Sequence, residues 1–209
     1  MAKKGCRVVL LDISDGMLNV ANEKIAGESL EQRIDVRKGD IRELSFDEET
    51  FDMVLCEHAL FLFKDQDQVL DQLARVLKKK APIIVSAQNR YAQSLAHLPE
   101  NLVPEKLLQA LNVLGGLEYD SMTSDGALKI HSLTPNEFRA MLERHGLRVE
   151  KIVAKVVTTP LRIAPQFIMT REYSSDLFEK LLQLELAFCE RQDALALAAH
   201  LQAIARKIE

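Results

Sequence analysis

Residues 9–18 read Val-Leu-Leu-Asp-Ile-Ser-Asp-Gly-Met-Leu, and this stretch carries the main evidence for the fold class. The run from Arg7 to Leu11 is continuously apolar after its first residue, which predicts a strand buried on both faces, as in a parallel sheet. Ser14 or Asp15 is a suitable cap for a helix that follows at once and ends near Gly27. A strand that leads directly into a helix is typical of α/β proteins.

Strand patterns and helix patterns continue to alternate up to residue 86. Further strands are expected at 34–37, 51–56 and 82–86, and the clearest helix spans 65–77. This order of elements, joined by short loops, predicts a doubly wound α/β sheet. Sheets of this kind bind ligands at the carboxyl ends of their strands.

The second half of the chain is less regular. Residues 90–130 contain several prolines and glycines, and we expect an inserted substrate cap there with one helix near 104–114. Thr134, Pro135 and Glu137 then predict a capped helix that ends at Gly146.

We therefore expect three regions: 1–89 as a nucleotide-binding half, 90–130 as the cap, and 131–209 completing the same sheet. The last region should hold a strand over 147–157 and an added helix within 174–197. The alanine content of residues 200–207 favours a helix there.

Composition excludes several classes of protein. Apolar residues make up 47% and charged residues 28%, and 27 Lys and Arg against 31 Asp and Glu give a net charge of −4, unlike the basic balance of nucleic-acid binders. The three cysteines form no CxxC motif, which disfavours metal sites and disulfides and favours the cytoplasm. Apolar runs such as Ala59 to Phe63 are too short for a membrane span.

Acidic residues follow three of the expected strands. Asp12 ends the first strand, Asp40 follows the second, and Glu57 follows the third. A carboxylate at such a strand end binds ribose hydroxyls in nucleotide-binding folds, and a neighbouring one can accept a hydrogen bond from an adenine amino group. The alternative is that these acids only cap helices or end strands, which is common.

The residues around these acids carry a family resemblance. Residues 9–18, the segment Gly39-Asp40-Ile41, the run Phe51-Asp52-Met53-Val54 and the helix-to-strand segment 75–85 occur in the order of the class I S-adenosylmethionine-dependent methyltransferases, which they resemble. The helix from Thr134 and the closing residues 200–207 look like that family's last helix and its final antiparallel strand. The resemblance implies a Rossmann-like, mostly parallel sheet, S-adenosylmethionine as cofactor, and methyl transfer to a small-molecule acceptor.

The resemblance also implies roles for single residues. Asp12 would bind the ribose hydroxyls and Asp40 the adenine amino group. The remaining cofactor contacts would come from Ile13, Met17 and Ile41 around adenine, and from Cys56 and Glu57 near the methionine portion. Apart from the resemblance, His58 is a candidate general base because it follows Glu57 at the sheet edge; the alternative is that it only starts a helix or packs under the cap. A homodimer is a further expectation; nucleic acid, membrane and metal are not expected as partners.

One departure from the family concerns its glycine-rich loop. No GxGxG occurs in the chain, and residues 1–8 resemble the end of the helix that follows that loop. The family's first strand, which lies between the strands expected at Arg7 and Met53, is therefore missing here. We expect weak cofactor binding and one of three outcomes for the sheet: the two strands pair directly, which we expect of a compact monomer; another segment or a second copy fills the space; or the isolated chain folds poorly.

Two other functions remain open. A non-catalytic relative of the methyltransferases could bind a partner or ligand through the same surface. A nicotinamide-dependent dehydrogenase would also use a strand-end acid, but it would explain none of the later motifs.

Overall fold

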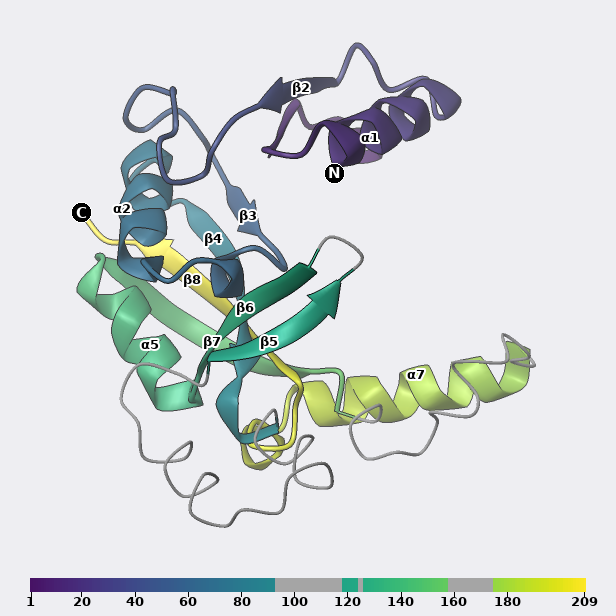
Figure 1. Ribbon diagram of the computed structural model, residues 1–209, viewed down its shortest axis with the longest axis vertical. Coiled ribbons are helices and arrows are strands. Elements are labelled where there is room, and N and C mark those ends of the chain that lie inside the picture. The colour runs from purple at the N-terminus through teal and green to yellow at the C-terminus, as the bar shows by residue number, and fades with distance from the viewer. Residues whose placement is uncertain (93–117, 124–125, 158–174) are drawn as a thin grey trace.

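The structure is a computed structural model, and it describes residues 1–92, 118–123, 126–157 and 175–209. Its strands form two separate sheets (Figure 1). The helices of the described residues are η1 (Ala2–Lys4), α1 (Asp15–Gly27), η2 (Leu60–Leu62), α2 (Gln66–Val76), α5 (Pro135–Arg144), α7 (Ser175–Cys189) and η3 (Gln192–Ala194). The strands are β1 (Val8–Asp12), β2 (Ile34–Lys38), β3 (Val54–Cys56), β4 (Pro82–Asn89), β5 (Glu118–Thr123), β6 (Gly126–Leu133), β7 (Leu147–Lys155) and β8 (His200–Lys207).

The larger sheet has six strands of mixed direction. Strand β4 pairs in parallel with β3 and, near its end, with β6, and it pairs antiparallel with β8. Strand β7 extends the sheet beyond β8, and β5 forms an antiparallel hairpin with β6. The smaller sheet holds only β1 and β2, which pair in parallel from Val8 opposite Ile34 to Asp12 opposite Lys38. The α/β class and the parallel start of the sheet are confirmed, and the sheet as a whole is mixed.

The hydrophobic core lies on the larger sheet. Helix α2 contributes Leu70 and helix α5 contributes Phe138, and both side chains are fully buried against the central strands. Ile83 of β4 and Leu201 of β8 are equally inaccessible. Burial of such a side chain contributes about 1.5–3 kcal/mol each, so this half of the molecule holds most of the stabilising apolar contacts.

The predicted helix starts are confirmed. The Ser14 hydroxyl accepts a hydrogen bond from the Met17 N–H (3.4 Å), and the Asp65 carboxylate accepts one from the Gln68 N–H (3.1 Å). At α5, Thr134 and Glu137 form the expected reciprocal capping box.

The final segment is a strand, as the family resemblance implied, and the helix favoured by its alanine content is wrong. Strand β8 lies between β4 and β7 and pairs antiparallel with both. Burial alternates along it, with Leu201, Ala203 and Ala205 inaccessible. Pairing on both edges satisfies its backbone groups and outweighs the weak helical preference of alanine.

Beyond residue 92, the described part of the expected cap consists of strands. Residues 118–123 and 126–133 form the β5–β6 hairpin, and β6 joins the sheet where Gln88 pairs with Ser132. This hairpin extends the sheet, and the substrate cap over 90–130 stays a prediction. The helix expected near 104–114 lies outside the described residues.

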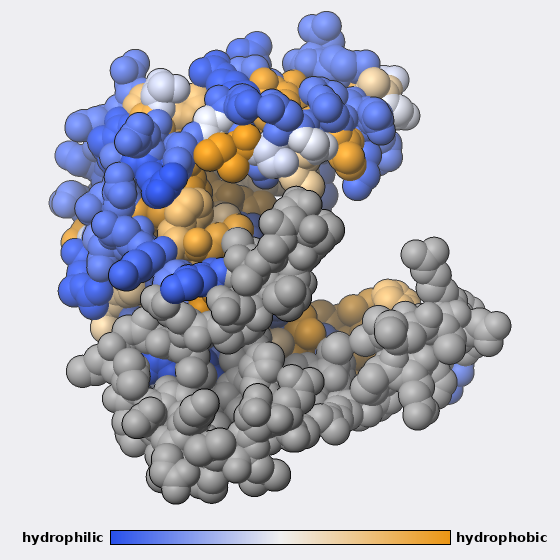
Figure 2. All heavy atoms as spheres, in the orientation of Figure 1, coloured by the Kyte–Doolittle hydropathy of each residue, from blue (hydrophilic) through white to orange (hydrophobic). Residues whose placement is uncertain are grey.

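The expected direct pairing of the first and third strands is wrong. Among the described residues, β1 pairs only with β2, and β3 pairs only with β4. A hollow lies between the α1–β2 region and the α2 region, and apolar side chains are visible inside it (Figure 2). One edge of β1 and one edge of β3 therefore remain without a strand partner in this part of the chain.

Candidate functional site

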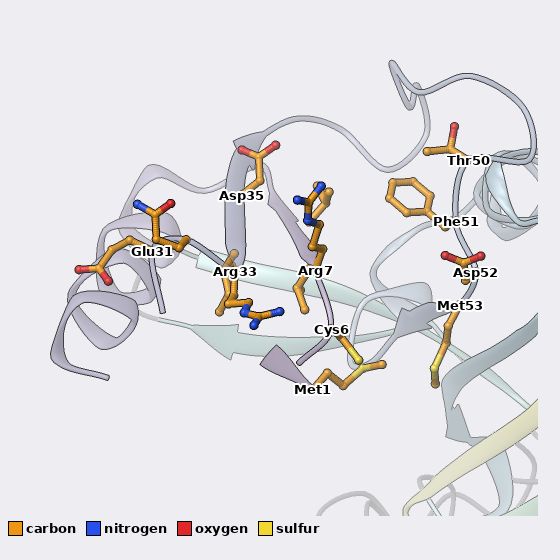
Figure 3. Close-up of a pocket in the computed structure, with 14 residues that line it drawn as sticks. Met1, Cys6, Arg7, Glu31, Arg33, Asp35, Thr50, Phe51, Asp52 and Met53 are labelled. Atoms are coloured by element: carbon orange, nitrogen blue, oxygen red, sulfur yellow. The ribbon is translucent and has the colours of Figure 1, made fainter. Parts of the chain in front are cut away.

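A groove separates the two sheets. It encloses about 750 Å³ and is lined on one side by residues at the start of β1 and on the other by the segment just before β3. In Figure 3, Arg7 and Arg33 lie on the β1–β2 side, and Phe51 and Met53 face them across the space. A smaller apolar pocket of about 160 Å³ continues from this groove toward helix α2.

The carboxyl ends of β1 and β2 bring two of the predicted acids to one edge. The Asp12 carbonyl accepts a hydrogen bond from the Gly39 N–H (3.0 Å), so Asp40 follows directly beside the end of β1. A Cβ at Gly39 would meet the end of the Leu11 side chain at 3.0 Å, so a larger residue there would require Leu11 to shift. The Asp12 carboxylate accepts the Ser14 N–H (2.8 Å) through one oxygen.

Asp40 is held by its neighbour Arg42. The guanidinium donates to both carboxylate oxygens, at 3.0 Å from Nε and 2.5 Å from Nη2, and the Arg42 backbone N–H also donates. These hydrogen bonds hold the pKa of Asp40 below its usual value. Because a carboxylate has about four acceptor positions, Asp40 can accept a further donor only when part of this clamp opens.

Large apolar side chains flank these acids. Ile13 and Met17 are 61% and 60% exposed, which is unusual for side chains of their size. Ile41 is partly buried and packs against the core. The predicted adenine-lining residues thus offer apolar surface next to Asp12 and Asp40.

The acid on the other side of the groove is already engaged. Burial would raise the pKa of Glu57, but hydrogen bonds from Lys155 (2.9 Å) and Gln202 outweigh it and lower the pKa. Cys56 is buried at 3% exposure, and desolvation raises the pKa of its thiol to about 12. Glu57 therefore carries a stable negative charge, and Cys56 is a neutral thiol.

His58 lies beside a second histidine that the sequence did not single out. Its backbone adopts a left-handed φ of 54°, and its N–H donates to the Ser86 hydroxyl (2.8 Å). The His58 ring is exposed, and its centroid lies 4.7 Å from that of His200 at the start of β8. Burial, followed by the charges of His58 and Lys155, lowers the pKa of His200 to about 4. Only pairing of β8 with β4 brings His200 here, so no local sequence signal marks it.

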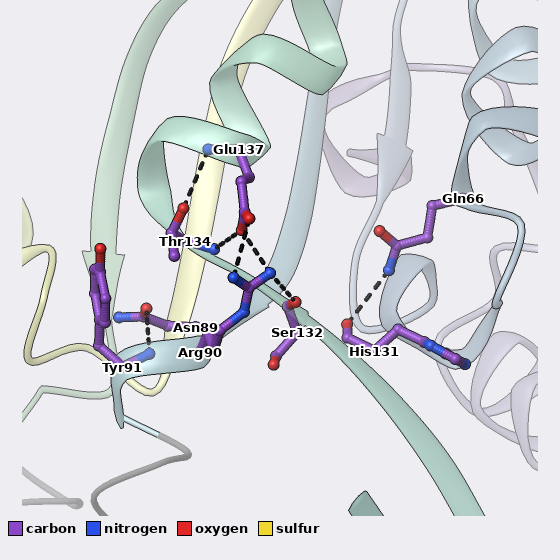
Figure 4. A network of polar contacts seen from close by, with 8 residues as sticks. All are labelled: Gln66, Asn89, Arg90, Tyr91, His131, Ser132, Thr134 and Glu137. Carbon is purple, nitrogen blue, oxygen red and sulfur yellow. Dashed lines mark hydrogen bonds and ion pairs between the residues drawn. The ribbon is translucent and has the colours of Figure 1, made fainter. Parts of the chain in front are cut away.

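A buried ion pair ties this end of the sheet to helix α5. The Arg90 side chain is 2% exposed and donates to the Glu137 carboxylate (2.9 Å). The same carboxylate accepts the Thr134 N–H at the start of α5 (Figure 4). Arg90 also donates to the Ser132 carbonyl (3.3 Å). In the described parts of the chain, no group of three His, Cys, Asp or Glu residues is arranged to hold a metal ion, and no helix is long and apolar enough to cross a membrane.

Comparison with known proteins identifies the class. Residues 1–85 match the methyltransferase domain family. This match covers less than half of the chain, and it identifies residues 1–85 as a domain of the class I S-adenosylmethionine-dependent methyltransferase family. Members of this family use S-adenosylmethionine as cofactor.

Individual relatives match only part of the chain. The chain is 38% identical over 71 residues to demethylmenaquinone methyltransferase of Lactobacillus johnsonii, covering 34% of this chain and 29% of the relative. It is 30% identical over 128 residues to phosphatidylethanolamine N-methyltransferase of Cereibacter sphaeroides, covering 60% and 61%. The chain thus spans less than two thirds of either relative.

Solved structures share the fold at low sequence identity. A SAM-dependent methyltransferase from Methanosarcina mazei superposes with a TM-score of 0.65 at 14% identity, covering 99% of this chain and 84% of that one. The cyclase SpnF superposes with a TM-score of 0.59 at 14% identity, covering 99% and 69%. The fold is therefore shared with a protein described by a different activity, and it does not define the reaction by itself.

Proposed function

We propose that this chain binds S-adenosylmethionine at the carboxyl ends of β1 and β2 and supports methyl transfer to a small-molecule or lipid acceptor. The observation that carries the proposal is the junction of Asp12 with Gly39, which sets two carboxylates at adjacent parallel strand ends beside exposed Ile13 and Met17. Acidic acceptors next to apolar surface suit a ribose joined to a flat purine ring.

The residues present fit the nucleoside part of the cofactor better than its methionine part. Within the described residues, the Asp12 carboxylate accepts one hydrogen bond, from the Ser14 N–H through Oδ1, so Oδ2 is available to ribose hydroxyls. Asp40 would accept from the adenine amino group once Arg42, 46% exposed, swings aside. Glu57 is committed to Lys155 and Gln202, so it would act on the methionine end through its charge. The bound cofactor would supply an electrophilic methyl group on a sulfonium.

His58 would accept a proton from the acceptor where the acceptor must lose one. Its ring is exposed at the carboxyl end of β3, and the neighbouring His200 is neutral at physiological pH because its pKa lies near 4. Alignment of the acceptor and exclusion of water would provide the rest of the rate enhancement.

Ligand-observed NMR with S-adenosylhomocysteine, which detects weak binding, tests the proposed nucleoside site. The change Asp12→Ala removes hydrogen bonds worth on the order of 1.5–3 kcal/mol, so we expect at least about tenfold weaker binding. Asp15→Ala is the matched control, because Asp15 lies three residues away and pairs with Lys38 instead. An unchanged affinity in Asp12→Ala would return Asp12 to a structural role at the strand end.

A second candidate is a non-catalytic protein that binds a ligand or partner through the same surface. The open groove favours it, because the ends of β1 and β3 are not joined by a continuous sheet. The names of the relatives suggest a quinone precursor or phosphatidylethanolamine as acceptors to assay. Formation of S-adenosylhomocysteine from S-adenosylmethionine with either acceptor supports the enzyme, whereas binding without turnover supports the second candidate.

A further inference from the structure

His200, at the start of β8, has a buried ring nitrogen that lacks a hydrogen-bond partner within the described residues. The atom is Nδ1, and it is inaccessible to solvent. Leaving a buried polar atom without a partner destabilises a protein, so nearly all such atoms have one. The partner of this nitrogen must therefore come from a side chain that can turn toward it or from a bound molecule.

His58 is a polar side chain in ring contact with His200. The two ring centroids lie 4.7 Å apart at an interplanar angle of 71°. Phe61, a further ring close to both histidines, has no polar atom to offer. The Lys155 ammonium donates to Glu57 and is engaged there. Rotation of the exposed His58 ring would bring one of its N–H groups to His200.

The two histidines differ in how firmly their surroundings hold them. His200 pairs with Gln88 of β4 on one side and with Lys155 of β7 on the other. His58 follows β3, and its backbone N–H donates to the hydroxyl of the fully buried Ser86 (2.8 Å), while its ring is exposed. The backbone of His200 is therefore fixed on both sides, and the His58 ring is the one that can turn.

The charge state of His200 suits a hydrogen-bond acceptor. Burial, followed by the charges of His58 and Lys155, lowers its pKa to about 4, whereas Glu57 acts in the opposite direction. At physiological pH the ring is neutral, and a neutral imidazole has one nitrogen that accepts a hydrogen bond. When neutral His58 donates its N–H to that nitrogen, the other nitrogen of His58 carries no proton. Such a nitrogen can act as a base.

We propose that His200 is a positioning residue for His58: it accepts an N–H from the His58 ring and so fixes the tautomer in which the other His58 nitrogen is left unprotonated for the methyl acceptor. A base that is oriented by a third group is a recurring arrangement in catalysis. The acceptor's proton passes to the free nitrogen, His58 becomes an imidazolium, and its first N–H stays on His200. This inference rests on the proposed role of His58 as the base.

Nitrogen NMR of the full chain, with isotope-labelled histidine and without cofactor or acceptor, tests the proposal. At about pH 8, where unperturbed histidines are neutral, we expect a coupling between a His58 and a His200 ring nitrogen across their hydrogen bond. We also expect His58 to favour one neutral tautomer. The tautomer ratio should fall at least about threefold in His200→Phe, which keeps a ring but removes the acceptor nitrogen.

Phe61→Leu is the matched control, because the Phe61 centroid lies 6.2 Å from each histidine ring and carries no nitrogen. It should leave the tautomer ratio of His58 within about twofold. A smaller fall in His200→Phe, an equal fall in Phe61→Leu, or absence of the coupling would overturn the proposal. The coupling is measured in the unchanged chain, so it decides the matter even where a variant fails to fold.

The same measurements are independent of the proposed methyl transfer. Neither cofactor nor acceptor is present, so a missing hydrogen bond between His58 and His200 would leave cofactor binding and turnover unaffected. Conversely, an intact coupling in a chain that transfers no methyl group would count against the proposed function alone.

Discussion

At the scale of single residues, His200 links the site to the pH dependence of stability. Its pKa falls from 6.5 to about 4 in the folded chain because the ring is partly buried and lies beside His58 and Lys155. Between these two pH values, His200 therefore binds a proton in the unfolded chain but not in the folded chain. Stability from this residue is complete above pH 6.5 and is lost as the pH falls toward 4.

The change His200→Gln should therefore flatten part of this pH dependence. We expect the free energy of unfolding, measured with urea, to fall less steeply from pH 6.5 to 4 in the variant than in the unchanged chain. The difference between the two proteins removes the contribution of the other titrating groups. Parallel curves would show that His200 titrates normally in the folded state.

At the scale of elements, Glu137 holds helix α5 to the sheet through two roles at once. It caps the helix start at Thr134 and pairs with the buried Arg90. Glu137→Ala should cost about 3 kcal/mol of unfolding free energy, because it leaves a buried guanidinium without its carboxylate. The control Glu143→Ala, in an exposed pair with Arg139 at 3.7 Å, should cost no more than about 0.5 kcal/mol. Equal losses in the two variants would contradict a special role for Glu137.

The sequence predicts these elements well where the signal is local. The caps at Ser14 and Thr134 are read from neighbouring residues, and the structure has both. Residues 200–207 have no such signal, because their strand state depends on pairing with β4 and β7, which are distant in the chain. The apolar run of β1 correctly predicts a strand, but its residues are only partly buried because one edge faces the groove.

The residues of the candidate site also differ in how far local sequence signals predict their positions. The strand-end positions of Asp12 and Asp40 follow from the alternation of strands and loops, and the structure places them together. The engagement of Glu57 by Lys155 and Gln202, and the contact of His58 with His200, join segments about a hundred or more residues apart. Contacts of this kind depend on tertiary packing and leave no pattern along the chain.

At the scale of the whole molecule, the central feature of the proposed site is its division between two sheets. Asp12 and Asp40 lie at the ends of β1 and β2, whereas Glu57 and His58 follow β3 across the groove. A ligand that needs both groups must span two bodies whose facing backbone edges are not bonded to each other. Its affinity should be low, because binding would also have to order the two sheets relative to one another.

Isothermal titration of S-adenosylmethionine into the 209-residue chain tests this account most directly. The divided site, together with a sequence that holds no GxGxG to cradle the methionine end, predicts a dissociation constant well above the micromolar range. Micromolar or tighter binding by the chain alone would contradict the account, because it would mean that the cofactor is held without a continuous sheet between β1 and β3.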